Sequence, residues 1–388
     1  MSTHDTIHIP EWWREMTLGE VVEITSSKRI FAEEYKDSWV PFYRGKEIIE
    51  KFNGGKISTE LYISEEKYHE INTKFGAPKW WDMLLTSVWT IWIPYIVRND
   101  ERFYFKDWNL TWFKGFNGIL NIFLFYWLTS EYGKEEIQRH KIWSTQEALT
   151  IVWLKSISLP LPPLPEQRAI ADMLSSLDAK IELLREQNET LEKTAQTIFQ
   201  EWFGRYSVES PEELPEGWRV GKIMEIIKRE PVSYKCDKKD IDSNGTIPII
   251  DQWTNGLYWY TSRSPDFIAS PEKPVILFTN HTCNYWFIDY PFCAIQNVLP
   301  YRGKDGYDEY FLYFMTKWSI TFIEYKWHWP DFEAKDFIIP SVEKAQEFSK
   351  LAKPILEKVS FNNSQIQFLS KTRDILLLKL MSGEVRVV

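Results

Sequence analysis

The sequence predicts an α+β fold in which two similar mixed α/β domains are separated by two long helices, packed on each other as an antiparallel coiled coil. Three observations predict it: an internal repeat, two helical stretches with a seven-residue apolar spacing, and strand-like segments at matching places in both copies. The copies therefore form a pseudo-two-fold internal repeat. The predicted boundaries are 1–157 for the first domain, 158–205 for the central helix, 206–337 for the second domain and 338–388 for the C-terminal helix.

The internal repeat is visible in three pairs of matching segments. The first pair, IPEWWR from Ile9 and LPEGWR from Leu214, is separated by 205 residues. The other pairs are NLTWFKG (109–115) with NVLPYRG (297–303) and IFLFYWL (122–128) with YFLYFMT (310–316), each separated by 188 residues. Each copy then leads through a proline-marked boundary, LPLPPLPEQ (159–167) or IIPSVEKAQ (338–346), into a long helical pattern.

Both helical stretches carry two rows of mainly apolar residues, which is typical of a coiled coil. The rows are Ile170, Leu177, Leu184, Leu191, Ile198 with Leu174, Ile181, Asn188, Ala195, Trp202, and Phe348, Ile355, Asn362, Leu369, Leu376 with Ala352, Val359, Ile366, Arg373, Leu380. A single amphipathic helix lying on a globular core remains the alternative for the first stretch. Pro354 could kink the second stretch or begin its regular part. Asn188 and Asn362 interrupt the rows, and a buried amide of this kind sets register and partner choice.

Strand-like segments rich in β-branched and aromatic residues fill both domains. They are 21–27, 82–97 and 102–107 in the first copy, and 245–252, 273–280 and 284–290 in the second. The aromatic block 122–128 and the following SEYGKEEIQRHK predict a helix that ends in basic residues.

Composition excludes several classes of protein. A hydrophobic content of 44% and a charged content of 26% are ordinary for a folded protein, so disorder and collagen are out. The longest apolar run, ILNIFLFYWL, is too short to span a bilayer, and no secretory leader is expected. Three cysteines without CxxC spacing make a zinc site or disulfide framework unexpected. The net charge of −9 argues weakly against a free-standing nucleic-acid binder, but not against a subunit that holds DNA with local patches.

Catalytic motifs are missing, so polar, basic and aromatic loops at equivalent places in both copies are the candidates for function. Lys and Arg hold phosphates, while amides, hydroxyls and Arg read base edges. Each residue could instead be an ordinary solvated loop residue. The DNA-binding candidates are Lys28, Arg29, Arg44, Lys46, Lys79, Thr86, Ser87, Thr90 and Arg98 in the first copy, and Gln252, Thr254, Asn255, Arg263, Thr279, Asn280, His281, Lys326 and His328 in the second.

Together these features resemble the specificity (S) subunit of type I restriction-modification enzymes, over essentially the whole chain. The most specific segments are LPPLPEQRAIADMLSSLDAKIELLREQNETLEKTAQTIFQEWF (161–203), the repeat start at 214–219 and the terminal LLLKLMSGEVRV. The resemblance implies two target recognition domains, each reading one half of a split double-stranded DNA sequence. It also implies helices that dock two DNA adenine methyltransferase (M) subunits, with restriction (R) subunits able to join.

The resemblance further implies that methyl donor and ATP belong to those partners. No catalytic residue, cofactor, metal or membrane contact is then expected of this chain, in the cytoplasm of a bacterial or archaeal cell. The alternative is a coiled-coil scaffold whose aromatic-rich end domains bind carbohydrate or protein, since exposed tryptophans would serve that function too.

The chain departs from the family pattern at a systematic set of tryptophans. The family has glycine in a turn resembling SVGTIG, whereas 87–92 read SVWTIW, and Trp12 stands opposite Gly217 in the repeat. The 16 glycines compare with about 27 expected at the usual ~7%. Either the loops are remodelled or tryptophan stands in place of glycine, and we favour the second. The positions are Trp12, Trp81, Trp89, Trp92, Trp108, Trp143, Trp153, Trp253, Trp259, Trp318 and Trp327.

Overall fold

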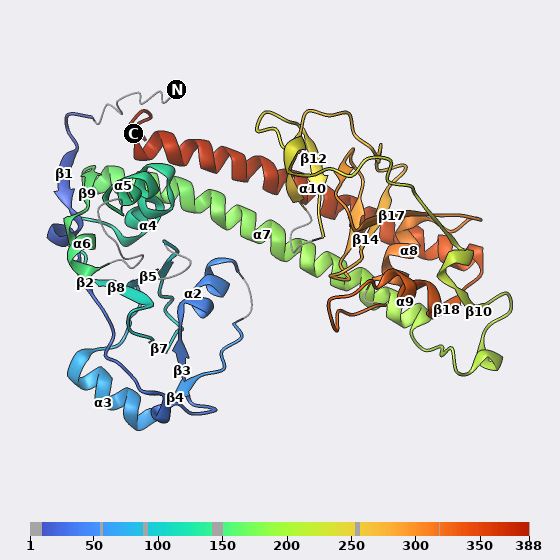
Figure 1. Cartoon of the computed structure of the whole chain (residues 1–388), viewed down its shortest axis with the longest axis horizontal. Helices are drawn as coiled ribbons and strands as arrows, with labels where there is room; N and C mark the ends of the chain where they lie inside the picture. The colour runs from blue at the N-terminus through green and yellow to red at the C-terminus, as the bar shows by residue number, and fades with distance from the viewer. Residues whose placement is uncertain are drawn as a thin grey trace. The chain divides into compact units, whose positions relative to one another are not determined.

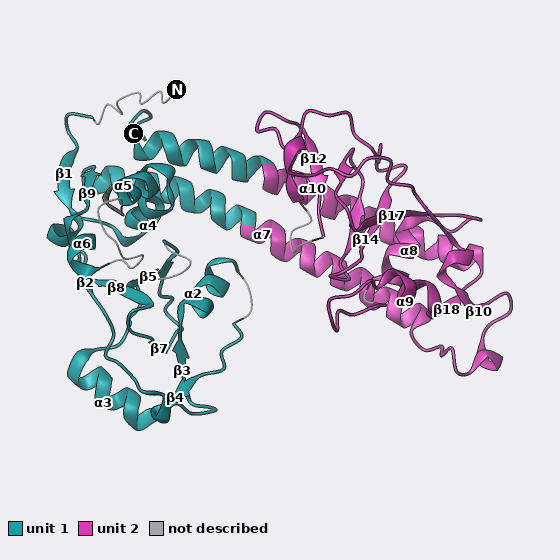
Figure 2. Cartoon of the chain, viewed as in Figure 1, with its two compact units in different colours: residues 1–181, 368–388 teal, residues 182–367 magenta. Residues whose placement is uncertain are grey.

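The structure is a computed structural model that describes residues 10–54, 57–87, 92–141, 150–252, 257–317 and 319–387. The chain divides into two compact units, which Figure 2 distinguishes by colour. Unit 1 comprises 1–181 and 368–388, and unit 2 comprises 182–367. Each unit therefore holds one copy of the repeat together with a part of both long helices.

The long helices are α7 (Leu164–Phe203) and α10 (Val342–Met381), each of 40 residues. They run side by side in opposite directions (Figure 1). In unit 1, Ile170 and Leu380 share one hydrophobic cluster, and in unit 2 the rings of Phe199 and Phe348 meet edge to face at 5.3 Å. These pairings confirm the antiparallel coiled coil, and α10 continues through Pro354. Among the described residues, no helix is both long and apolar enough to cross a membrane.

Each unit contains a four-stranded antiparallel sheet with the same strand order. In unit 1 the order is β2 (Glu23–Thr25), β8 (Leu110–Lys114), β5 (Met83–Thr86), β6 (Pro94–Ile96), and in unit 2 it is β11 (Ile227–Arg229), β17 (Val298–Gly303), β14 (Val275–Thr279), β15 (Tyr285–Ile288). The strands β5 and β14 are buried along their whole length, which explains their continuous apolar sequence.

Two smaller sheets also recur in both units. The three-stranded sheets are β4 (Tyr62–Ile63), β3 (Val40–Tyr43), β7 (Tyr104–Phe105) and β13 (Leu257–Thr261), β12 (Ile247–Ile250), β16 (Cys293–Ala294). The two-stranded sheets pair β1 (Arg14–Thr17) with β9 (Ser158–Leu161) and β10 (Arg219–Lys222) with β18 (Asp336–Ile339). The third strand is parallel to its neighbour in both three-stranded sheets. The duplication predicted from the sequence is therefore confirmed strand by strand.

The remaining helices are short. They are α1 (Leu18–Val21), α2 (Gly45–Phe52), α3 (Glu65–Phe75), α4 (Asn121–Thr129), α5 (Glu131–Lys141) and α6 (Ile151–Ser156) in unit 1, and α8 (Glu309–Thr316) and α9 (Trp329–Ala334) in unit 2. The prediction of one helix from 122 to 141 was wrong, because Ser130 adopts an extended conformation between α4 and α5. Its hydroxyl accepts the N–H of Gly133 at 3.0 Å and so caps the first turn of α5.

Several tryptophans adopt the left-handed backbone conformation that favours glycine. Their φ values are 107° at Trp39, 74° at Trp81, 78° at Trp92 and 66° at Trp108. Three of these four were expected from the sequence, and Trp39 was not. By contrast, Trp12, Trp153, Trp259 and Trp327 are not among the residues with positive φ. The expected positions Trp89, Trp143, Trp253 and Trp318 lie outside the described residues.

Candidate nucleic-acid interface

The two units share a backbone junction at the end of a central strand. In unit 1, the N–H of Ser87, just after β5, donates to the carbonyl of Asn109 at 2.9 Å. In unit 2, the N–H of Asn280, just after β14, donates to the carbonyl of Asn297, also at 2.9 Å. The candidates Ser87 and Asn280 therefore occupy equivalent positions in the two copies of the fold.

Asn280 also attaches the start of α9 to this junction. Its backbone carbonyl accepts the N–H of His328 at 3.0 Å, and its side-chain Oδ1 accepts the N–H of Trp329 at 2.9 Å. All three residues are buried. The side chain of Asn280 thus brings together two segments that are almost fifty residues apart in sequence.

His281 and Lys326 lie together beside this junction. The Nδ1 of His281 is 2.8 Å from the carbonyl oxygen of Lys326, and its ring stacks on Tyr325 at a centroid distance of 4.4 Å. The ammonium group of Lys326 is 3.3 Å from the Asp331 carboxylate and 3.6 Å from that of Glu324. Hydrogen bonding to Asp331 is the main cause that raises the pKa of Lys326, so this side chain stays cationic.

Gln252 is tied to the same region through its backbone. Its carbonyl accepts the hydroxyl of Thr282 at 2.5 Å and the amide of Asn284 at 3.1 Å. The hydroxyl of Thr282 also contacts that of Thr279 at 2.7 Å. The Oε1 of Gln252 is buried and has no hydrogen-bond partner among the described residues.

A cavity of about 480 Å³ opens at this end of β14. Its lining combines cations, amides and indole rings: Arg229, Val232, Lys235, Asn280, Ile295, Gln296, Asn297, Val298, Leu299, Trp327, Trp329 and Pro330. The guanidinium of Arg229 lies 5.3 Å from the ring centre of Trp329. Cations hold phosphates and amides pair with base edges, so this lining suits a nucleic acid.

Two of the hydroxyls predicted as base readers in the first copy, those of Thr86 and Ser87, face the interior. Ser87 Oγ is 2.6 Å from Thr111 Oγ1, and Thr86 Oγ1 accepts the N–H of Ile93 at 3.0 Å. Both residues are buried. These contacts leave neither hydroxyl on the surface.

Three of the six basic candidates of the first copy are paired with carboxylates. The pairs are Arg29 with Asp107 at 2.8 Å, Arg44 with the buried Glu47 at 2.7 Å and Lys46 with Glu50 at 3.9 Å. The hydrogen bond to Glu47 is the main cause that raises the pKa of Arg44. Because each ion pair leaves donors on the cation free, the pairing positions these side chains without preventing contact with phosphate.

Three further basic candidates of the first copy, Lys28, Lys79 and Arg98, are exposed. Lys28 lies 5.0 Å from the ring centre of Phe75. The N–H groups of Lys79 and Arg98 donate to the carboxylates of Asp82 and Glu101, at 2.9 and 3.1 Å. These bonds fix the turns and leave the two side chains directed to solvent.

Two DNA-binding candidates of the second copy, Arg263 and His328, have contacts that stabilise the fold. The guanidinium of Arg263 lies 3.7 Å from the ring centre of Tyr234 and 3.7 Å from Asp240. His328 is 1% exposed, with Nδ1 at 3.2 Å from Asp331 and Nε2 at 3.0 Å from the carbonyl of Glu324. Burial and full pairing make His328 a structural residue of the segment before α9.

Four residues that line the cavity were not predicted from the sequence, and three predicted residues lie outside the described part of the chain. Arg229, Lys235, Gln296 and Trp329 line the cavity but were not singled out, although Gln296 directly precedes the repeat segment 297–303. The candidates Thr90, Thr254 and Asn255 lie outside the described residues.

Comparison with known proteins gives concordant matches. Residues 10–193 match the family described as "Type I restriction modification DNA specificity domain". The chain is 26% identical to the type I restriction enzyme MjaIX specificity subunit of Methanocaldococcus jannaschii, over 98% of this chain and 95% of that protein. It is 32% identical to the MjaVIII specificity subunit of the same organism, over 49% of this chain and 45% of that protein.

A solved structure matches over nearly the full length. It is the crystal structure of the type I restriction-modification system S subunit from M. genitalium, with a TM-score of 0.57 and 16% sequence identity. The match covers 98% of each chain. This likeness supports the duplicated α+β fold.

Proposed function

We propose that this chain, which belongs to the family of type I restriction-modification specificity subunits, reads a split double-stranded DNA target and assembles methyltransferase and restriction subunits around it. The observation that carries the proposal is the repetition of the four-stranded sheet, with the same strand order, in two units that share α7 and α10. Two similar modules in one chain suit two half-sites, because each can read its own bases.

In unit 2, the cavity at the end of β14 is the proposed place of DNA contact. Arg229 and Lys235 would hold phosphate, while Asn280, Gln296 and Asn297 supply amides at the same cavity. In unit 1, the exposed side chains of Lys79 and Arg98 are the proposed phosphate contacts.

The long helices are the proposed docking surface for adenine methyltransferase subunits. On α10, Phe361, Phe368 and Ile375 are spaced by seven residues and are 56%, 70% and 58% exposed. This row is separate from the buried row of the coiled coil, so it is available to a partner. A helix that exposes a continuous apolar row is an expected site of helix-on-helix or helix-in-groove binding.

In this proposal the chain itself is non-catalytic, and methyl donor and ATP are bound by the partner subunits. The pure chain should then transfer no methyl group and cut no DNA, while methylation should appear when a matching methyltransferase subunit is added. Methyl transfer by the chain alone, after stringent purification, would refute this part of the proposal.

The decisive experiment is single-molecule sequencing of modified adenines in DNA exposed to the complex of this chain and its methyltransferase. The expected result is one motif with two short specified halves and an unspecified gap. A continuous motif, or methylation without sequence preference, would contradict the proposal.

Salt dependence separates DNA binding from the alternative of a carbohydrate- or protein-binding scaffold. The affinity of the complex for DNA should fall steeply with salt. Arg229→Ala should reduce the slope of log affinity against log salt by about 1, because one phosphate is then no longer neutralised. Lys350→Ala is the matched control, since Lys350 is exposed on α10 and lies outside the cavity lining. Salt-independent binding, or equal effects of the two variants, would count against the cavity as a DNA site.

A further inference from the structure

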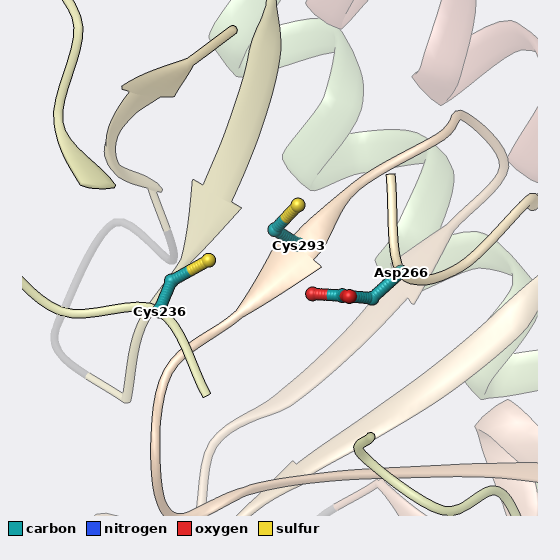
Figure 3. A group of neighbouring side chains, drawn as sticks. All are labelled: Cys236, Asp266 and Cys293. Atoms are coloured by element: carbon teal, nitrogen blue, oxygen red, sulfur yellow. The ribbon is translucent and has the colours of Figure 1, made fainter. Parts of the chain in front are cut away.

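Two cysteines and an aspartate from distant segments converge in unit 2. The thiol sulfurs of Cys236 and Cys293 and a carboxylate oxygen of Asp266 all lie within 4.8 Å of one another. Figure 3 shows the three side chains converging from three separate segments, with the Asp266 carboxylate directed toward the two cysteines. These residues are not part of the cavity at the end of β14.

Backbone hydrogen bonds hold the three segments together. Cys293 lies on β16, where it pairs with Ile249 of β12, and the N–H of Cys236 donates to the carbonyl of Ala294 at 3.0 Å. Asp266 precedes Phe267, which exchanges two hydrogen bonds of 3.1 Å with Phe292. The position of each side chain is thus fixed by the sheet and its flanking loops, so the cluster is preorganised.

The two cysteines of the cluster are buried, Asp266 is partly buried, and one of its carboxylate oxygens has no hydrogen-bond partner among the described residues. Cys236 is 4% exposed and Cys293 is fully buried. The Oδ2 of Asp266 is buried and has no hydrogen-bond partner among the described residues. An unpaired buried carboxylate oxygen is costly, and a bound cation would remove that cost.

We propose that Cys236, Cys293 and Asp266 bind a thiophilic divalent metal ion, with Zn²⁺ as the ion that fits the donors best. Two thiolates and one carboxylate are a ligand set that Zn²⁺ accepts, and tetrahedral coordination leaves one position for water or another oxygen. The carbonyl oxygen of Ser264, 3.6 Å from the Cys293 sulfur, is one oxygen at hand. The ion would clamp the loop at 236 and the loop at 266 to β16.

The corresponding place in unit 1 is filled differently. Tyr104 of β7 pairs with Phe42 of β3 as Cys293 pairs with Ile249, and its hydroxyl accepts the N–H of Lys28 at 2.7 Å. The side chain of Tyr104, whose hydroxyl is hydrogen-bonded, therefore joins strand β7 to the segment that contains Lys28. Unit 2 has the smaller side chains of Cys236 and Cys293 at the equivalent place, and a metal ion bound by both would connect β16 to the segment that contains Cys236.

The charge of the site is also compatible with an ion. Two thiolates and a carboxylate carry three negative charges against two positive charges on Zn²⁺. The ion therefore lowers the charge of the ligand set from −3 to −1, which reduces the cost of placing it among buried residues. The Asp266 carboxylate is under the influence of both the Arg263 guanidinium and the Asp240 carboxylate, which form an ion pair with each other at 3.7 Å.

The test is metal analysis of the full-length chain, purified under reducing conditions without chelator and loaded with Zn²⁺. Elemental analysis after desalting should give about one Zn²⁺ per chain. Cys236→Ser and Cys293→Ser should each lose it. Cys283→Ser is the matched control, because Cys283 is also a buried free thiol but packs in a different hydrophobic cluster, and this variant should retain the ion.

Cobalt loading gives a second readout, which already tests the site in the wild-type chain. The wild-type chain loaded with Co²⁺ should show thiolate-to-cobalt charge-transfer absorption, and Asp266→Asn should alter that spectrum. The proposal fails if wild-type protein binds neither ion, or if both serine variants at 236 and 293 keep the metal. It also fails if a chain purified separately without reductant, and then denatured, titrates one free thiol instead of three, because the two cysteines would then form a disulfide.

Discussion

Asn362 donates a side-chain N–H to the Oδ1 of Asn188 at 2.8 Å, across the interface of α10 and α7 in unit 2. Asn188 in turn donates to the Oδ1 of Asn363, also at 2.8 Å. Asn362 is fully buried, whereas Asn363 is exposed. The buried amide pair can form in one register of the two helices, since a shift of either helix separates it.

We predict that the amide pair contributes both stability and register. Asn362→Ala should lower the free energy of unfolding by about 1–3 kcal/mol, because it removes a buried donor and leaves Asn188 short of one bond. Thermal or urea unfolding of the full chain measures this. Asn363→Ala is the matched control at an exposed site and should cost less. Equal losses in the two variants would show that the buried pair has no special role.

The exposed apolar row of α10 predicts a partner contact. Phe368→Asp should abolish co-purification with the methyltransferase subunit, because it places a charge in the proposed docking surface, while leaving unfolding of the isolated chain nearly unchanged. Gln367→Asp introduces the same charge at the neighbouring exposed residue and should preserve the complex. Should Phe368→Asp still assemble normally, the row would not be the docking surface.

Helix length should set the gap in the DNA target. One heptad added to α7 after Asn188 and one added to α10 beside Asn362 lengthen both helices by about 10.5 Å, or roughly three base pairs. The motif of modified adenines should keep both halves and gain a longer gap. An unchanged gap in an active complex would leave the helices as a docking surface with no measuring role.

The two modules should read independently. Replacing residues 1–155 by the same region of a relative with a different target should change one half of the motif. The other half should stay, because its reading residues lie in unit 2. Simultaneous change of both halves would show that the target is read by the two units jointly.

Tryptophans with positive φ should be improved by glycine. Trp81→Gly and Trp108→Gly should each raise the melting temperature, because a left-handed conformation costs a residue with Cβ about 1–3 kcal/mol. Trp80→Gly is the control: Trp80 is also exposed and directly precedes Trp81, but is not among the residues with positive φ. It should be neutral or destabilising. A loss of stability at Trp81 or Trp108 equal to that at Trp80 would mean that the indoles themselves stabilise the loops.

Much of this architecture follows from the sequence by itself. The seven-residue rows predicted α7 and α10, and row members such as Ile170, Leu174, Ala352 and Leu380 are indeed buried. The matched segments at 109–115 and 297–303 predicted equivalent strands, which the structure has as β8 and β17. Both signals are local and periodic, and a period in the sequence maps directly onto one face of a helix or onto a repeated unit.

Other features were decided only by the tertiary structure. Ser87 and Asn280 are equivalent in backbone position, yet Ser87 turns its hydroxyl to Thr111 while Asn280 captures the N–H of Trp329. Cys236 and Cys293 are not at a spacing typical of metal ligands in the sequence. They meet because the N–H of Cys236 donates to the carbonyl of Ala294 on β16. Such contacts depend on which segments the sheets bring together. The separation of two residues along the chain does not predict whether they meet in space, because loops of very different length can be closed at similar cost.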